Sequence, residues 1–247
     1  MGDSMARKMI LFTIVIIIAI SCGKQETCHI SAGKYSQITI PLQNIDRLYI
    51  NGRINLDLIQ DSTNYIILKG GENIINAVEI KNENNQLKII DNNTCYWLRN
   101  YDNWINIELH YTNINYINPE IYGNMIFKNT CSQDTLNIEV WNAAFDIKGE
   151  VNLKKFIFRS HGGIIGLYLT GQSKYIYTYL HGSGPQHLEN LCSDTVAVNH
   201  SSYQNIYVCA ERVLWVDINS SGNVYYKGNP LQKIINYKGS GKVIKME

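Results

Sequence analysis

The sequence predicts an all-β fold, a right-handed β-helix-like solenoid with coils of about 19–21 residues. Three observations predict it. The composition favours strands, because the chain of 247 residues has 17 Tyr but only 5 Phe and 4 Pro, and Tyr and Ile suit pleated, half-buried surfaces. Turns of small residues recur at a nearly constant spacing through the C-terminal half. The apolar segments between them are short, as strands are.

The recurring turns define the repeat. They centre on Ala144, Gly163, Gly184, Tyr203, Gly222 and Gly241, which are 19 or 21 residues apart. A unit of about 20 residues is too short for a propeller blade of about 40. It matches one solenoid coil, in which like positions of successive coils stack about 4.8 Å apart. An antiparallel β-sandwich is the alternative architecture.

The segments before the turns are the expected strands of the repeat. They span residues 155–158, 175–180, 195–198, 213–218 and 233–237. Alignment on the turn centres predicts a core column six positions before each centre. Its members are Ile157, Thr178, Ala197, Val216 and Ile235. It also predicts a polar column three positions before each centre. Its members are Ser160, His181, His200, Asn219 and Lys238.

The N-terminal half is rich in strands but less periodic. Alternation predicts strands over residues 35–40, 47–59, 64–70 and 86–90. A brief helical segment is expected within residues 70–80, and the aromatic-rich segment 93–104 is a candidate functional loop. We expect a β-rich region over residues 35–115 and a repeat region over 116–247. One continuous solenoid of about ten coils remains the alternative.

The first residues are typical of a targeting signal. Arg7 and Lys8 precede an apolar run over residues 9–20, and Ala19–Cys22 resembles a bacterial lipobox. Residues 1–22 are therefore predicted to be a lipoprotein signal peptide with its lipobox, Cys22 to be the lipidated residue, and residues 23–34 to be a tether. The anchor would hold the protein at the cell envelope, on the outer membrane. An ordinary cleaved signal is the alternative.

The remaining cysteines are expected to be buried free thiols. The chain has six Cys, at 22, 28, 95, 131, 192 and 209. If Cys22 carries lipid, an odd number remains and complete pairing is impossible. None of them forms a CxxC pair or a zinc-ligand spacing.

Several stretches resemble a known family. They are residues 70–89 (GGENIINAVEIKNENNQLKI), the recurring Gly-Ser-Gly turns, and residues 220–230 (SSGNVYYKGNP) with the later YKGSGKV. With the lipobox-like start, they make the chain similar to the bacterial auto-transporter adhesin "head GIN" family over most of its length after Tyr35. The resemblance implies a β-helix-like fold and an envelope location. It implies no catalytic residues.

The sequence predicts no nucleotide, nucleic-acid or catalytic site. The GSGK at residues 239–242 lacks the P-loop pattern, because position 236 is Asn and position 243 is Val. The formal net charge of +1 gives no basic footprint for nucleic acid. The acidic residues of the repeat fall in different columns, which argues against paired carboxylates. They are Glu139, Asp146, Glu150, Asp194, Glu211 and Asp217.

Histidines and tyrosines are the remaining candidates. His181 and His200 share a predicted column, with His161 one position away, but no Cys or carboxylate completes a metal site there. We therefore expect no metal and no cofactor. Tyr175, Tyr177 and Tyr179 alternate along one strand. They form either a binding platform or a stacked ladder that stabilises the sheet.

These observations favour a non-enzymatic, lipid-anchored cell-envelope protein. It would act as an adhesin or binding module that contacts the membrane through its anchor and a glycan or envelope protein through its solenoid surface. Two alternatives remain. One is a polysaccharide-active enzyme built on a β-helix, and the other is an envelope scaffold or assembly factor.

Overall fold

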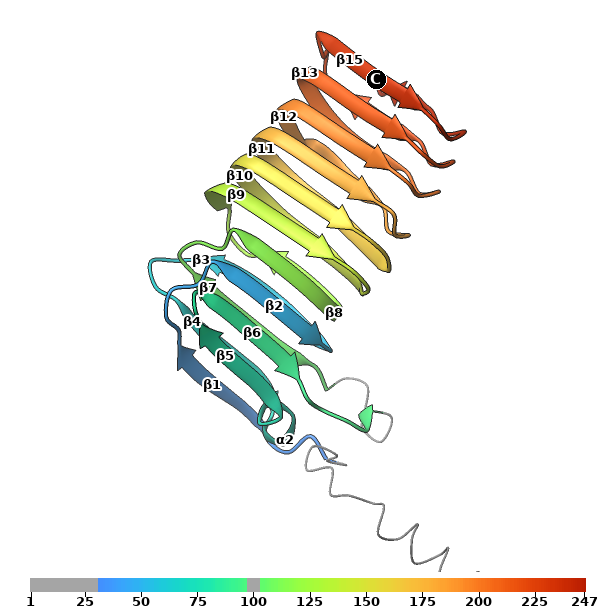
Figure 1. Cartoon of the computed structure of the whole chain (residues 1–247). Helices are drawn as coiled ribbons and strands as arrows, with labels where there is room; N and C mark the ends of the chain where they lie inside the picture. Colours follow the sequence, from blue (N-terminus) through green and yellow to red (C-terminus); the bar gives the residue numbers. More distant parts are fainter. Residues whose placement is uncertain (1–30, 97–102) are drawn as a thin grey trace, which may run out of the picture.

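The computed structural model describes residues 31–96 and 103–247. The chain is 68% strand and 2% helix and forms a β-solenoid of about six turns. In Figure 1 the strands lie side by side along a rod, from β1 at one end to β15 near the C-terminus at the other. The predicted all-β solenoid is confirmed. The alternative of about ten regular coils is wrong, because the first strands form an irregular end of the rod instead of regular coils.

Each regular coil has two limbs joined by a bend, and each limb pairs in parallel with the same limb of the next coil. The strands that build these coils are β8 (Tyr116–Phe127), β9 (Cys131–Val140), β10 (Ala144–Ser160), β11 (Ile164–Leu180), β12 (Gln186–His200), β13 (Ile206–Ile218), β14 (Val224–Lys227), β15 (Gln232–Tyr237) and β16 (Val243–Lys245). Phe156 of β10 pairs with Ile176 of β11, which pairs with Val196 of β12, so these steps are 20 residues. The predicted period is confirmed there.

The two limbs give two parallel sheets that face each other across the core. First limbs pair along β10, β11, β12, β13, β14 and β16, and second limbs along β9, β10, β11, β12, β13 and β15. Side chains alternate inward and outward along each limb. The inward ones, such as Leu167 and Phe156, are fully buried.

The N-terminal end of the rod contains the antiparallel strands. β1 (Tyr35–Pro41) pairs with β4 (Tyr65–Gly71), β4 pairs with β7 (Ile105–Tyr111), and β5 (Val78–Glu83) pairs with β6 (Gln86–Asp91), all antiparallel. The helix α2 (Glu72–Ile75) is the helical segment expected within residues 70–80. Antiparallel pairing ends the stacking of coils on this side.

One coil lies out of sequence order. β2 (Arg47–Gly52) lies between β6 and β8, and β3 (Ile54–Gln60) lies between β7 and β8. The chain therefore builds the coil of β2 and β3, forms the end of the rod, and then returns to continue from this first coil with β8. Strand pairing thus runs across residue 115, where the two expected regions meet.

The predicted core column is wrong at two coils. The inward column reads Phe158, Thr178, Val198 and Val216 in register, whereas Ile157 and Ala197 point outward. The turn centres are not in constant phase with the strands, because register shifts interrupt the pairing of β11 with β12 and of β12 with β13. A shift of one residue exchanges the inward and outward sides of a strand.

The predicted polar column fails for the same reason. Ser160 and His200 are buried and face the core, whereas His181, Asn219 and Lys238 are exposed at the turns. Ser160 and His200 are each in register with the buried Leu180. These two members of the predicted polar column therefore lie in the core.

Glycine is required at two bends of the chain where neighbouring coils approach closely. Gly171 has φ of +112° at the bend of β11, and a Cβ there would lie 2.1 Å from the carbonyl oxygen of Val151 on the coil before. A Cβ on Gly241 would lie 2.0 Å from the carbonyl oxygen of Gly222. The GSGK stretch is therefore a coil turn, as its spacing predicts, and Lys242 is exposed.

The prediction of free thiols is wrong for most of the described cysteines. Cys192 and Cys209 form a disulfide with a Cα–Cα distance of 4.6 Å, and Cys95 is also disulfide-bonded. The register shift between β12 and β13 places Cys192 directly opposite Cys209 on neighbouring coils. Cys131 is a buried free thiol. Cys22 and Cys28 lie outside the described residues.

Candidate binding surface

The outer face of the first-limb sheet carries a continuous aromatic ladder. Tyr168, His187, Tyr207 and Tyr225 occupy one column on β11 to β14. Their ring centroids are 5.2, 4.7 and 5.1 Å apart and neighbouring ring planes differ by at most 14°. Each ring covers much of the next, so these side chains stabilise the sheet more than they offer a surface. We call this column the stacked ladder.

The outer face of the second-limb sheet carries an interrupted series instead. Tyr177 of β11, Ala197 of β12 and Trp215 of β13 lie in one column. Because Ala197 has only a methyl group, a hollow of about 240 Å³ remains over it. We call this hollow the aromatic trough. Its lining residues are Tyr175, Tyr177, Ala197, Val198, Asn199, Trp215 and Asp217.

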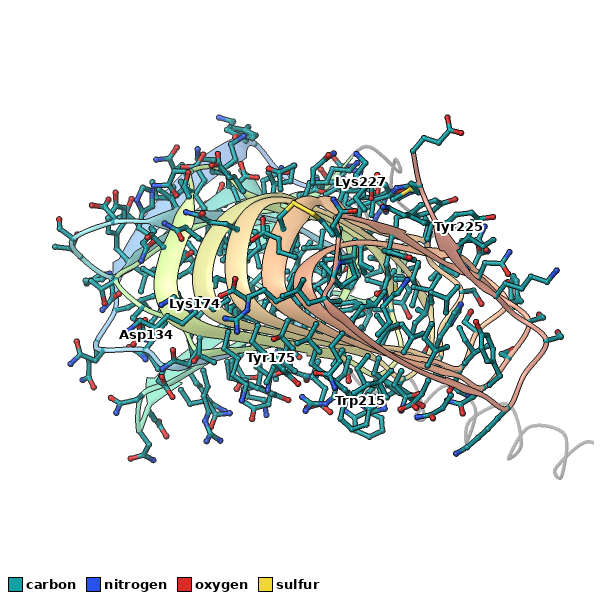
Figure 2. All side chains as sticks on the ribbon, turned by 90° about the horizontal axis from the view of Figure 1, so that it is seen from above. Asp134, Lys174, Tyr175, Trp215, Tyr225 and Lys227 are labelled. Atoms are coloured by element: carbon teal, nitrogen blue, oxygen red, sulfur yellow. A yellow bond between two sulfur atoms is a disulfide. The ribbon has the colours of Figure 1, made fainter. Side chains whose placement is uncertain are left out.

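The aromatic trough is open to solvent on a rigid sheet. Trp215 is 47% exposed, and its strand is paired on both sides, with β12 and with β15. In Figure 2, Tyr175 and Trp215 project from one side of the solenoid, and Tyr225 lies toward the other. The trough and the stacked ladder thus belong to different faces.

One edge of the aromatic trough is polar. Asn199 and Asp217 are register partners on β12 and β13. The amide of Asn219 donates to Asn199 Oδ1 at 2.9 Å, and the amide of Asn236 donates to Asp217 Oδ1 at 2.8 Å. In the described part of the chain, Asn199 Nδ2 and Asp217 Oδ2 make no hydrogen bond. A donor and an acceptor therefore remain for a ligand, on side chains held by their neighbours.

Two cations lie on β10, the coil before Tyr175 and Tyr177. The Arg159 guanidinium is 5.3 Å from the centroid of the Tyr177 ring, and the Lys155 ammonium is 5.8 Å from that of Tyr175. Both are cation–π contacts. Burial raises the pKa of Tyr177 above its ordinary value, which keeps the phenol neutral.

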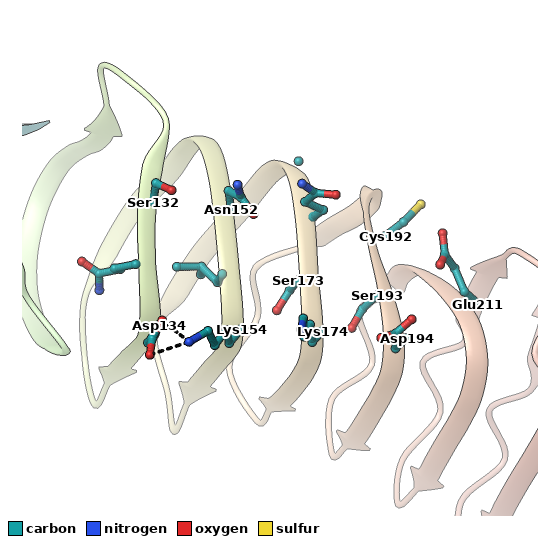
Figure 3. Close-up of a pocket in the computed structure, with 14 residues that line it drawn as sticks. Ser132, Asp134, Asn152, Lys154, Ser173, Lys174, Cys192, Ser193, Asp194 and Glu211 are labelled. Carbon is teal, nitrogen blue, oxygen red and sulfur yellow. Dashed lines mark hydrogen bonds and ion pairs between the residues drawn. The ribbon is translucent and has the colours of Figure 1, made fainter.

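A second, polar hollow of about 680 Å³ follows the bends of β9 to β13 (Figure 3). We call it the polar groove. Asp134, Lys154, Lys174 and Asp194 lie at corresponding positions of successive coils along it. Lys154 Nζ is 2.8 Å from Asp134 Oδ1, but the two side chains are 63% and 75% exposed. Such exposed pairs contribute little to stability.

One expectation about carboxylates is wrong in the polar groove. The pairing passes from Ser193 with Ala210 to Thr195 with Val213, so Glu211 and Arg212 both oppose Asp194 in a bulge. Asp194 and Glu211 therefore line the groove from neighbouring coils, although their sequence positions predict different columns. A hydrolytic reaction in this groove would need a pair of carboxylates, and these two lie on neighbouring coils.

The histidines do not form the predicted ladder. His200 is fully buried, and burial lowers the pKa of its imidazole to about 4. His181 is exposed at a turn. The His161 ring stacks on Trp141 at 4.0 Å, and its Nε2 lies 2.9 Å from Glu139 Oε1. Within residues 31–96 and 103–247, no group of three or more His, Cys, Asp or Glu side chains could hold a metal ion.

Comparison with known proteins identifies the family. The family model described as "Putative auto-transporter adhesin, head GIN domain" matches residues 44–230, a range that includes the aromatic trough and the polar groove. The chain belongs to this family. The resemblance read from the glycine turns is thereby confirmed. No protein of curated function matches the sequence.

Solved structures share the fold. A putative adhesin from Bacteroides fragilis NCTC 9343 is 17% identical, with a TM-score of 0.80 over 86% of this chain and 97% of its own. A putative lipid binding protein from Parabacteroides distasonis ATCC 8503 is 18% identical, with a TM-score of 0.63 over 87% and 98%. A putative adhesin from Parabacteroides merdae ATCC 43184 is 16% identical, with a TM-score of 0.59 over 87% and 97%.

Sequence reasoning found part of the aromatic trough. It singled out Tyr175 and Tyr177, but it missed Trp215 and assigned Ala197 to the core. The available signal was spacing, because Tyr177 and Trp215 are 38 residues apart, or two coils of 19. Half of the candidate loop 93–104, residues 97–102, lies outside the described residues, as does Cys22. Where the chain is described, no helix is both long and apolar enough to cross a bilayer.

Proposed function

We propose that this protein is a lipid-anchored, non-enzymatic component of the cell envelope that binds a surface ligand through the aromatic trough, as an adhesin would. The trough is the observation that carries the proposal. It presents exposed aromatic rings and unpaired polar atoms on a sheet whose strands are fixed on both sides. Rigid elements hold binding groups more precisely than loops do.

Three features support the location. The apolar segment before Cys22 and the lipobox-like residues suit export and acylation. The disulfide between Cys192 and Cys209 suits an oxidising compartment outside the cytoplasm. The names of the family and its structural relatives, putative adhesins, suit a surface protein rather than an enzyme.

The fold also suits display of the aromatic trough away from an anchor. The tether would lead into the end of the rod that holds β1 and α2 (Figure 1). From β6 to β12 there are six strand spacings in the second-limb sheet. At about 4.8 Å each, they place the trough about 29 Å along the rod.

The lipid anchor is tested by Cys22→Ser in the full chain. Cells labelled with radioactive palmitate are expected to incorporate the label into the wild-type protein and not into C22S, which would leave the membrane fraction. Cys28→Ser is the matched control and should keep the label. Label on C22S would contradict the anchor.

Binding is tested on isolated cell envelopes. The wild-type chain is expected to be retained, and Trp215→Ala is expected to lose retention at least ten-fold. Tyr225→Ala removes an aromatic side chain from the opposite face and should bind as the wild type does. Equal retention of W215A and the wild type would contradict a function of the aromatic trough.

The enzyme alternative has a specific observation behind it, the carboxylates of Asp194 and Glu211 on neighbouring coils of the polar groove. A polysaccharide hydrolysis screen with the wild type and an Asp194→Asn, Glu211→Gln double variant tests it. We expect no turnover from either protein. Turnover that the double variant abolishes would establish the enzyme instead. Cross-linking in native membranes tests the scaffold alternative, which requires contacts with envelope proteins alone.

A further inference from the structure

We propose that the aromatic trough binds one neutral pyranose unit of a glycan, which lies over Ala197 between Tyr177 and Trp215. This inference rests on the proposed function and names its ligand class. The features that carry it are the spacing of the rings, the polar edge formed by Asn199 and Asp217, and the positions of the nearby cations.

The spacing suits one sugar ring. Tyr177 and Trp215 are two coils apart, so their backbones are separated by about 9.6 Å. Ala197 forms the floor between them. The volume of about 240 Å³ is below the roughly 300–1,000 Å³ of pockets for drug-sized ligands. A single ring unit fits this volume, and the rest of a chain would continue into solvent.

The chemistry of the walls matches that of a pyranose. A sugar ring has apolar C–H faces and a rim of hydroxyl groups that both donate and accept hydrogen bonds. The rings of Tyr177 and Trp215 suit the C–H faces, because aromatic faces carry partial negative charge. Asn199 Nδ2 can donate to one hydroxyl and Asp217 Oδ2 can accept from its neighbour, since both atoms lack protein partners among the described residues.

The charges around the aromatic trough disfavour charged ligands. A quaternary ammonium against these rings would be repelled by the Arg159 guanidinium and the Lys155 ammonium, which already lie near Tyr177 and Tyr175. An anion at the polar edge would meet the Asp217 carboxylate. A neutral ligand avoids both repulsions. The bonds from Asn219 and Asn236 fix the polar edge before binding, so little side-chain entropy is lost.

The experiment titrates the full chain with methyl pyranosides of glucose, galactose, mannose and N-acetylglucosamine. The readout is the indole N–H signal of Trp215 in a ¹H–¹⁵N spectrum, assigned with Trp215→Phe. At least one pyranoside should shift this signal in a saturable way, with a dissociation constant on the order of 1 mM, as suits one ring. Choline chloride and methyl glucuronide should not shift it.

Ala197→Tyr is the decisive variant. A tyrosine there continues the column from Tyr177 to Trp215, fills the trough and leaves the core unchanged. It should weaken pyranoside binding at least ten-fold while the melting temperature stays the same or rises. Tyr225→Ala is the matched control. It should melt at a lower temperature because it shortens the stacked ladder, and it should bind the pyranoside as the wild type does.

The outcomes separate this inference from the proposed function. If no pyranoside shifts the Trp215 signal, or if A197Y binds as tightly as the wild type, the saccharide inference is overturned. The proposed function then stands only if W215A still loses retention on cell envelopes. A shift caused by choline that A197Y removes would assign the trough to an ammonium ligand and overturn the inference as well.

Discussion

His200 predicts that the protein loses stability in mildly acidic solution. Its imidazole is fully buried, in register with Leu180 and Ile218 on the neighbouring coils. Burial lowers its pKa from 6.5 to about 4, although the nearby backbone of Gln204 offsets part of this effect. Nε2 has no hydrogen-bond partner in the described structure. A charged imidazolium would therefore be poorly compensated inside the core.

The magnitude follows from linkage between protonation and folding. The unfolded chain takes up a proton at this imidazole below pH 6.5, whereas the folded chain does so only below about pH 4. The contribution of the neutral His200 to the free energy of unfolding is fully present above pH 6.5. It decreases as the pH falls toward 4 and changes no further below that. One pKa unit corresponds to about 1.36 kcal/mol, so the loss is about 3 kcal/mol in full and about 2 kcal/mol at pH 5.

The assay compares urea unfolding of the wild type and His200→Leu at pH 7.5 and pH 5. Leucine continues the apolar column of Leu180 and Ile218. From pH 7.5 to pH 5, the free energy of unfolding should therefore fall by about 2 kcal/mol less in the variant than in the wild type. His181→Leu, at an exposed turn, should retain the wild-type pH dependence. If H200L loses as much stability as the wild type between pH 7.5 and 5, the buried imidazole is not the cause.

Three further predictions concern the solenoid. Replacing both Cys192 and Cys209 with Ala opens a bridge of sequence separation 17 and should lower the free energy of unfolding by about 3 kcal/mol. Urea unfolding measures this, and an unchanged midpoint would contradict it. Gly171→Ala should lower the free energy of unfolding by about 3 kcal/mol or more, because of the positive φ and the contact with Val151. Thermal melts measure this, and the neighbouring exposed Thr170→Ala should change the melting temperature little. Tyr207→Ala removes two stacked contacts and should cost about 1–3 kcal/mol without altering retention on envelopes.

The coil period could be predicted because its cause is local. At turn positions such as Gly184 and Gly241, a side chain would collide with the backbone of the coil before. Small residues therefore recur at most of the turns, and the recurrence is visible without any knowledge of pairing. The strands between the turns are equally local, since their alternation needs only a few residues.

The direction of each side chain could not be predicted from the turns. Alignment on turn centres assumes that every coil has the same length, but the pairing of β12 with β13 shifts twice. The earlier shift between β11 and β12 places Ala197 on the outer face and His200 in the core. Only the register of neighbouring coils contains this information, and one residue of error reverses every assignment.

The disulfide and the aromatic trough depend on that same register. Parity shows that the five cysteines other than Cys22 cannot all pair, but it does not show which of them meet. Cys192 meets Cys209 because β13 reaches the bend after fewer residues than β12 does. Trp215 joins Tyr177 across Ala197 for an equally non-local reason, so neither residue alone indicates a site.

The ligand of this chain cannot be taken from its structural relatives, and the solenoid explains why. At 17% identity over 86% of the chain, the Bacteroides fragilis protein shares the fold while most positions differ. In such a fold the inward columns determine stability, and the outward columns are largely free of that constraint. Ala197 occupies an outward column, and a larger side chain there would close the aromatic trough without disturbing the core. The proposed binding would therefore depend on single outward positions such as this one, which is why A197Y tests the trough more directly than any change in the interior.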